Sequence, residues 1–321
     1  MNNNQAIIDM LRADMRDEHA AIVQYLQHAY ALGESGEACE IEGIARDEMR
    51  HLDWLAEAIV DLGGDPDMKR GVVDLEGAGP IDWMARDVAA EERAISQYEQ
   101  HLAAIDDPKI KRLLERILSD ERAHHGDFEA LSDELAAEGD HPPTVLEART
   151  ANDASPAVLD VLQTGVEHEY TVILQYLYHN FVMPDCEVGR ELEMQAINEM
   201  QHMGWLSEEI ADLTGHPRME HSRLELKGSP AEMLQADIKA EKAVERVYTR
   251  QIDELDDEDL KVLIARIRDH ETYHAAVFED LLEHVESSGE AGTQSDEPVR
   301  TDESKPPESQ QRFTVGSLMK K

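Results

Sequence analysis

The sequence predicts an all-α protein built from two tandem four-helix bundles. Apolar residues recur at spacings of three and four residues in eight stretches, which is the period of an amphipathic helix. Aromatic residues make up only 5% of the chain, and Ala, Leu, Glu and Arg are abundant, which favours helices over strands. A pattern of acidic residues and histidines also occurs twice, 150 or 151 residues apart. With 321 residues, the chain is long enough for two domains of ordinary size.

Four helices are predicted in the first half, each bounded by residues that stop a helix. Gly33 follows the first helix, Gly63 and Gly64 follow the second, Pro108 separates the third from the fourth, and Gly139 ends the fourth. Glycine is favoured just after a helix and proline at its first turn. The predicted helices span residues 5–32, 37–63, 81–106 and 108–138.

The second half repeats this arrangement, with Pro184, Gly215 and Gly228 as interruptions of the helical pattern. The longest connection in each half joins the second and third helices, at about residues 64–80 and 215–229. A connection of this length can cross a four-helix bundle from one end to the other. The predicted helices span residues 156–182, 186–214, 230–255 and 257–287.

The segments outside the predicted helices can be distinguished by their amino-acid composition. One stretch contains His-Pro-Pro and few large apolar residues, which is typical of a linker between domains. Another consists of Ser, Glu, Gln, Pro, Thr and Asp and cannot bury enough apolar surface to order itself, so disorder is expected. The predicted segments are a first domain at 1–138, a linker at 139–155, a second domain at 156–287, a disordered linker at 288–312 and a terminal peptide at 313–321.

The repeated pattern has the composition of a metal site. Each copy reads lone Glu, Glu-x-x-His, lone Glu, Glu-x-x-His, with one group per predicted helix. Residues three apart share a helix face, so each half can direct four carboxylates and two imidazoles into its core. Four buried carboxylates need compensating charge, which two divalent cations supply, as in four-helix di-iron and di-manganese proteins. The predicted ligands are Glu18, Glu48, His51, Glu91, Glu121 and His124 in the first half, and Glu169, Glu199, His202, Glu241, Glu271 and His274 in the second.

Comparing the two copies position by position selects among neighbouring glutamates. Glu167 corresponds to Arg16, and Glu92 corresponds to Lys242, so neither glutamate has an acidic counterpart. Both are therefore excluded as ligands. A single Glu-x-x-His motif could simply contribute surface charge. Four such motifs at matched positions in the two halves disfavour this alternative.

Tyrosines accompany the predicted ligands. Tyr25 and Tyr176 follow the first glutamate of each half at the same distance, and Tyr98 corresponds to Tyr248. We predict a catalytic role for Tyr25 and Tyr176, either as hydrogen-bond donors or as radical sinks beside the metals. The alternative is a buried tyrosine whose hydroxyl is simply satisfied.

The charge of the chain excludes some partners. Its 70 acidic and 30 basic residues give a formal net charge of −40, which argues against nucleic acids and anionic membranes. The negative surface could concentrate cations, or it could serve solubility or a salt-adapted host. No run of 18 apolar residues and no signal peptide is found, so a cytoplasmic protein is expected. Cys39 and Cys186 form no Cys-x-x-Cys motif; free thiols are expected, with a disulfide as the alternative.

The motif Glu-x5-Gln-Tyr-x2-His, followed by Asp/Asn-Glu-Met-x-His, resembles the bacterioferritins over residues 5–138 and 156–287. The resemblance implies two ferritin-like domains, each with a di-iron ferroxidase centre that oxidises Fe²⁺ with O₂ or H₂O₂. It also implies that Glu48 and Glu121 bridge two metals, as Glu199 and Glu271 would, while the other ligands are terminal.

The resemblance extends to a second cofactor. Met49 and Met200 match the position from which the family ligates a haem between two subunits, so they are candidate haem ligands. The alternative is that both methionines only pack at the interface between the bundles, as in haem-free relatives.

Two features depart from the family: the fusion of two subunits and the long acidic tail. Phe313, Val315 and Leu318, near the end of the tail, resemble the apolar anchors of peptides that load cargo into encapsulin nanocompartments. The alternative is a frayed terminus. We therefore expect a ferroxidase carried inside an encapsulin shell in the cytoplasm, with oligomerisation left open. The alternatives are a di-manganese catalase or peroxidase, and a non-catalytic iron- or haem-binding protein.

Overall fold

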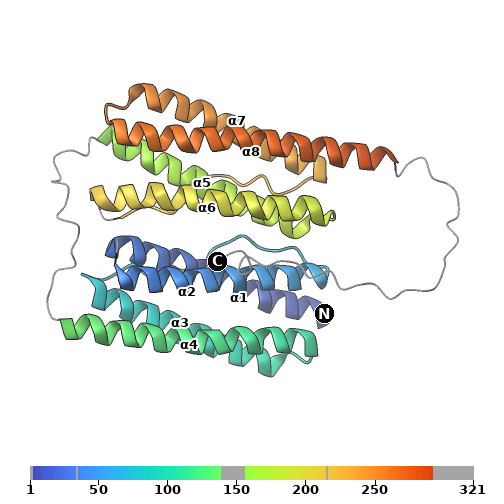
Figure 1. Cartoon of the computed structure of the whole chain (residues 1–321). Helices are drawn as coiled ribbons and strands as arrows, with labels where there is room; N and C mark the ends of the chain where they lie inside the picture. The colour runs from blue at the N-terminus through green and yellow to red at the C-terminus, as the bar shows by residue number, and fades with distance from the viewer. Residues whose placement is uncertain (1–2, 34, 139–155, 215, 292–321) are drawn as a thin grey trace, which may run out of the picture.

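A computed structural model describes residues 3–33, 35–138, 156–214 and 216–291. Over these residues the chain forms helices and no strands, as predicted (Figure 1). None of the helices described is long and apolar enough to cross a membrane. The predicted linker at 139–155, residues 292–312 of the linker predicted at 288–312, and the peptide at 313–321 lie outside the described residues. The helices are α1 Asn3–Leu32, α2 Gly36–Asp61, α3 Pro80–Ala104, α4 Pro108–Glu138, α5 Pro156–Val182, α6 Cys186–Thr214, α7 Pro230–Glu254 and α8 Glu258–Ala291.

Each half is a four-helix bundle, and Figure 1 shows the two bundles side by side. In the first bundle α1 packs on α2 and α3 on α4, and the two pairs meet through α1–α3 and α2–α4 contacts. The second bundle repeats these contacts with α5 to α8. The connection from α2 to α3 runs along α1, because the Gly71 amide donates to the Arg16 carbonyl (2.9 Å) and the Asp74 amide to the Gln24 side chain (2.8 Å).

Local sequence explains where several helices begin and end. The Ser35 hydroxyl accepts a hydrogen bond from the Ala38 amide (3.0 Å) at the start of α2. Ser229 and Glu232 form a capping box at the start of α7. Gly33 follows α1 with φ of 67°, a conformation that favours glycine. Several helix ends differ from the predicted ones by one or two residues. The largest difference is at the end of α8, which continues past residue 287 to Ala291, because proline, the strongest stop, first appears beyond it at Pro298.

The bundles meet through α1 and α2 on one side and α5 and α6 on the other. His19 and Tyr170 occupy equivalent positions in the two halves, 151 residues apart, and lie 2.5 Å apart through His19 Nε2 and the tyrosine hydroxyl. Burial lowers the pKa of His19 to about 4, so at neutral pH its free nitrogen accepts the hydroxyl hydrogen. Arg70 also crosses the interface and donates to the Met219 carbonyl (2.7 Å). At this interface, equivalent positions of the two halves thus carry different residues that form a hydrogen bond with each other.

Candidate metal centres

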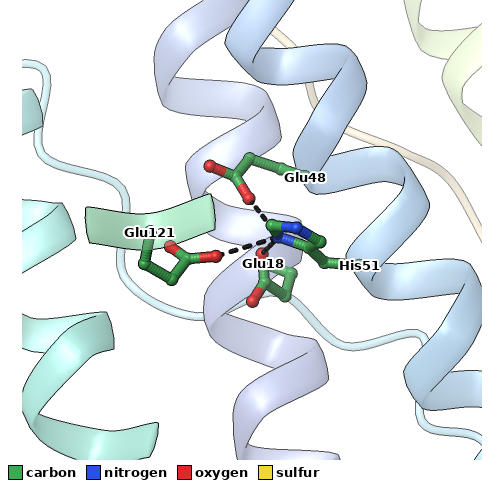
Figure 2. A group of neighbouring side chains, drawn as sticks. All are labelled: Glu18, Glu48, His51 and Glu121. Carbon is green, nitrogen blue, oxygen red and sulfur yellow. Dashed lines mark hydrogen bonds and ion pairs between the residues drawn. The ribbon is translucent and has the colours of Figure 1, made fainter. Parts of the chain in front are cut away.

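The six predicted ligands of the first bundle converge from all four helices, and we call them centre 1. α1 and α3 supply one glutamate each, while α2 and α4 supply a glutamate and a histidine each. Two groups of four ligand atoms form, each group lying within 4.8 Å, and both groups contain Glu48 and Glu121. Glu18 and His51 complete one group (Figure 2), and the remaining two residues complete the other. Centre 1 consists of Glu18, Glu48, His51, Glu91, Glu121 and His124, all buried.

The second bundle repeats the arrangement, and we call it centre 2. Its two groups share Glu199 and Glu271, the counterparts of Glu48 and Glu121. The His202 Nδ1 atom lies 2.7 Å from Glu199 and 3.1 Å from Glu271. Centre 2 consists of Glu169, Glu199, His202, Glu241, Glu271 and His274, all buried.

Several ligand atoms in both centres are buried without a hydrogen-bond partner. In centre 1 they include Glu48 Oε1, Glu91 Oε2, Glu121 Oε1 and His124 Nδ1. The His124 Nδ1 atom lies only 2.9 Å from Glu48 Oε1, at ion-pair distance but without hydrogen-bond geometry. Buried polar atoms are normally satisfied, so unsatisfied atoms that face one another indicate a missing partner. Oxygen and imidazole donors in this arrangement fit a pair of divalent cations such as iron or manganese.

The pKa shifts of the ligands in centre 1 also indicate a missing positive charge. Burial raises the pKa of Glu18 well above its usual range, and the neighbouring Glu121 and Glu48 add to the rise. Burial opposes ionisation of Glu48 as well, but His51 and His124 beside it lower its pKa. Burial alone would lower the pKa of His124, yet the carboxylates of Asp47 and Glu48 beside it raise the pKa to about 10. Without a metal, protons therefore supply the positive charge that cations would bring.

Centre 2 has the same electrostatic character. Burial and the charges of Glu271 and Glu199 raise the pKa of Glu241 well above its usual range. Although burial opposes protonation, the surrounding carboxylates raise the pKa of His202 to about 12 and that of His274 to about 9.

Tyrosines hold the lone glutamates of both centres. Tyr25 donates its hydroxyl to Glu91 (2.5 Å), and Tyr176 donates to Glu241 in the same way. Two further tyrosines, for which no role is predicted from the sequence, do the same for the lone glutamates of α1 and α5: Tyr98 donates to Glu18, and Tyr248 to Glu169. Their matched positions in the two halves were the signal that could have identified them.

A second network orients the helices around each centre. Asp87 accepts hydrogen bonds from Gln24 (2.8 Å) and His28 (2.8 Å), linking α3 to α1. In the second bundle Asp237 accepts from Gln175 (2.8 Å) in the same way. These residues hold matched positions in the two halves, 150 or 151 residues apart.

The excluded glutamates lie outside the centres. Glu92 is 67% exposed and lies 3.7 Å from His125. Glu167 is exposed on α5. The two cysteines, Cys39 and Cys186, are free and exposed.

Met49 and Met200 line one apolar cavity between the bundles, together with Leu26, Ile173 and Phe181. The cavity has a volume of about 60 Å³, the room that about two water molecules take up at roughly 30 Å³ each. The two thioethers thus lie where a shared ligand between the halves would lie. A porphyrin needs more space than the cavity has with the bundles packed in this way.

Comparison with known proteins agrees with this fold. The model of the ferritin-like domain matches residues 8–137 and again residues 159–288. The chain therefore belongs to the ferritin-like family, with two such domains in tandem. Among its relatives is the bacterioferritin of Desulfovibrio desulfuricans, 37% identical over 125 residues, which cover 37% of this chain and 69% of the relative. The bacterioferritin of Rhodobacter capsulatus is 29% identical over 132 residues, covering 39% of this chain and 81% of the relative.

Solved structures of both relatives also match. The Desulfovibrio desulfuricans bacterioferritin, whose diiron site was captured in different catalytic states, matches with a TM-score of 0.41 and 30% identity over 43% of this chain and 85% of that chain. The Rhodobacter capsulatus bacterioferritin, with a metal-free dinuclear site and a haem iron, matches with a TM-score of 0.41 and 26% identity over 47% of this chain and 98% of that chain.

Proposed function

We propose that the protein is a ferroxidase that oxidises Fe²⁺ at both centres. The observation that carries the proposal is the pair of overlapping ligand groups in each bundle, which share two glutamates and contain unsatisfied donor atoms. Two Fe²⁺ ions would give up two electrons to one molecule of O₂ or H₂O₂ and become Fe³⁺. With two protons from solvent, O₂ is reduced to H₂O₂, or H₂O₂ to two molecules of water. Carboxylate oxygens are hard ligands and suit both oxidation states.

The residues of centre 1 have distinct proposed roles. Glu48 and Glu121, which belong to both ligand groups, would bridge the two ions. Glu18 and Glu91 would be terminal ligands, each fixed by a tyrosine hydroxyl. Glu199 and Glu271 would be the bridging residues of centre 2. The hydrogen bonds of Tyr25 and Tyr176 favour a positioning role for these tyrosines over that of a radical sink.

An oxygen electrode distinguishes this function from its alternatives. Adding Fe²⁺ to the aerobic protein should cause rapid O₂ consumption, with the iron recovered as Fe³⁺. A di-manganese catalase would instead evolve O₂ from H₂O₂ and would carry manganese after purification without added iron. A non-catalytic iron-binding protein would bind Fe²⁺ without accelerating its oxidation, and that result would contradict the proposal.

We further propose that the protein acts as cargo of an encapsulin nanocompartment in the cytoplasm, where the shell would hold the oxidised iron. The support comes from the sequence: Phe313, Val315 and Leu318 follow a long polar stretch and lie outside the described residues. Apolar side chains at such spacing can anchor a peptide in a groove. An oligomer of the tandem chain inside the shell is compatible with this proposal and is not required by it.

Deleting residues 313–321 should reduce co-purification with a co-expressed encapsulin shell to background. The triple substitution of Phe313, Val315 and Leu318 by serine should do the same, because each anchor loses about 1.5–3 kcal/mol of apolar burial. Changing Thr314 and Ser317 to alanine is the matched control and should leave loading intact. Unchanged co-purification of the triple variant would refute the cargo proposal.

The shared cavity supports a second cofactor proposal, namely a haem held by Met49 and Met200. Binding would require the side chains of this small cavity to move apart. Haemin added to the protein should then give a shifted Soret band, and replacing both methionines by leucine should abolish the shift. A spectrum identical in the two proteins would show that the methionines only pack.

A further inference from the structure

The two centres differ in what lies behind their imidazoles. In centre 1 the outward nitrogens face carboxylates: His51 Nε2 lies 3.5 Å from Asp120, and His124 Nε2 lies 3.5 Å from Asp47. Asp120 is held in turn by Arg116 at 3.1 Å. Both imidazoles of centre 1 thus have an anionic acceptor at their outer edge.

Centre 2 has lost both of these carboxylates. His270 stands at the position equivalent to Asp120, and Asn198 at the position equivalent to Asp47. The His202 Nε2 atom lies 2.8 Å from the His270 ring nitrogen, so one imidazole faces another. The Asn198 amide donates to Gln195 (3.3 Å). The two positions that hold carboxylates in centre 1 thus hold a neutral amide and an imidazole in centre 2.

This exchange changes how strongly the imidazoles bind a cation. A carboxylate that accepts the outer N–H fixes the orientation of the ring and raises the basicity of its other nitrogen. Such outer partners are worth about 10–100-fold in metal affinity. Metal affinity is therefore expected to be higher in centre 1, where both histidines have a carboxylate at their outer nitrogen.

Access to the two centres also differs. A cavity of about 700 Å³ in the first bundle has Glu18 and Glu121 of centre 1 in its wall. Asp17, Asp74 and Glu76 are further carboxylates in its lining. Arg93 also lines the cavity, but the carboxylates outnumber it, and a cavity dominated by one sign of charge concentrates ions of the opposite sign. The cavity can therefore gather cations beside centre 1.

The equivalent positions of the second bundle are less acidic. His168 replaces Asp17, Lys227 replaces Glu76, and the buried Val172 replaces Ala21. The Lys227 ammonium forms an ion pair with Asp65 of the first bundle. Glu225 keeps the carboxylate of Asp74, so a cation approaching centre 2 by the corresponding path would meet fewer carboxylates, together with a histidine and an ammonium group.

We propose that the two centres are unequal, with centre 1 binding divalent metal first and more tightly than centre 2. This inference rests on the proposed function, since it assumes that both clusters bind the substrate metal. It means that the tandem fusion loads iron in two stages, with the first bundle ahead of the second.

Anaerobic titration of the full chain with Co²⁺, followed by its visible absorption bands, tests the inference without relying on oxidation activity. We expect two phases of two ions each per chain, with dissociation constants at least about tenfold apart. Glu48→Ala should remove the tighter phase, and Glu199→Ala the weaker one. A single phase of four ions, or loss of the weaker phase in Glu48→Ala, would overturn the inference while leaving the proposed function intact.

Exchanging the outer residues provides a milder test in which all twelve ligands remain. Asp47→Asn with Asp120→His should weaken the tighter phase and bring the two phases together. Asn198→Asp with His270→Asp should strengthen the weaker phase. If neither exchange changes the titration, the outer residues do not set the difference, and the inference fails. Absence of Co²⁺ binding in the wild-type protein would overturn both the inference and the proposed function.

Discussion

Replacing Glu48 and Glu199 together by glutamine should lower the rate of Fe²⁺ oxidation by more than about 100-fold. Residues that only orient a ligand are worth about 10–100-fold, and these two glutamates belong to both ligand groups of their centres. The neutral amide keeps the size of the side chain but loses the charge and one of the two acceptor oxygens needed to bridge two cations. The measurement is the initial rate of O₂ consumption after addition of Fe²⁺.

The matched control is the double variant Glu92→Gln and Glu167→Gln. These exposed glutamates lie within two residues of Glu91 and Glu169 in sequence but outside the clusters. Their replacement should leave the rate within about twofold of wild type. Circular dichroism should show that all variants remain helical, because removing one partner of a buried ion pair also destabilises a fold. A folded Glu48→Gln and Glu199→Gln variant with wild-type oxidation would refute the ferroxidase assignment.

Divalent metal should strongly stabilise the fold. A ligand that binds only the folded state adds about 4 kcal/mol when its free concentration is about 1,000 times the dissociation constant. Two such ions per bundle would therefore raise the melting temperature by roughly 15 °C or more, at about 2–4 °C per kcal/mol. Calorimetry with and without Co²⁺ measures this effect.

The metal-free protein should also lose stability as pH rises. The pKa values of His274, His124 and His202, about 9, 10 and 12, lie above the ordinary value of 6.5. The folded state therefore binds more protons than the unfolded state, and stability that is full below pH 6.5 decreases as pH rises through the folded-state pKa values. The pKa of Glu241, which burial raises well above its ordinary value, changes stability in the same direction. The melting temperature of the metal-free protein should thus fall between pH 6 and pH 9.

The Glu48→Gln and Glu199→Gln variant is the control for both effects. It should show a much smaller rise in melting temperature with Co²⁺, because both centres lose a residue that belongs to two ligand groups. A metal-free wild-type protein that becomes more stable between pH 6 and pH 9 would contradict the buried protonated clusters. Equal stabilisation of wild type and variant by Co²⁺ would place the metal elsewhere.

Much of the fold can be predicted from the sequence, because the helical period is a local pattern and the two halves of the internal repeat can be compared position by position. The repeat aligned Glu91 with Glu241 and excluded Glu92, and in the structure Glu91 lies in the cluster while Glu92 is exposed. The ends of the helices are harder to predict from the sequence. The last turns of α8 contain Gly289, which falls in the predicted linker, but a helix already formed by the 31 preceding residues extends past a single glycine.

Contacts between helices were the part that sequence could not supply. Tyr98 and Tyr248 match in the two halves, but their partners Glu18 and Glu169 lie about 80 residues away on another helix. The pairing of His19 with Tyr170 likewise depends on how the two bundles dock. The exchange of Asp120 for His270 can be seen in the aligned halves, yet only the coordinates place both residues behind an imidazole.

The central claim is that each bundle binds a pair of iron ions between its two shared glutamates. Crystals grown without oxygen and soaked in Fe²⁺, with diffraction recorded on both sides of the iron absorption edge, locate the ions directly. We predict two anomalous peaks in each bundle, with Glu48 and Glu121 between one pair and Glu199 and Glu271 between the other. A map with one peak per bundle, or with iron only outside these clusters, would contradict the claim.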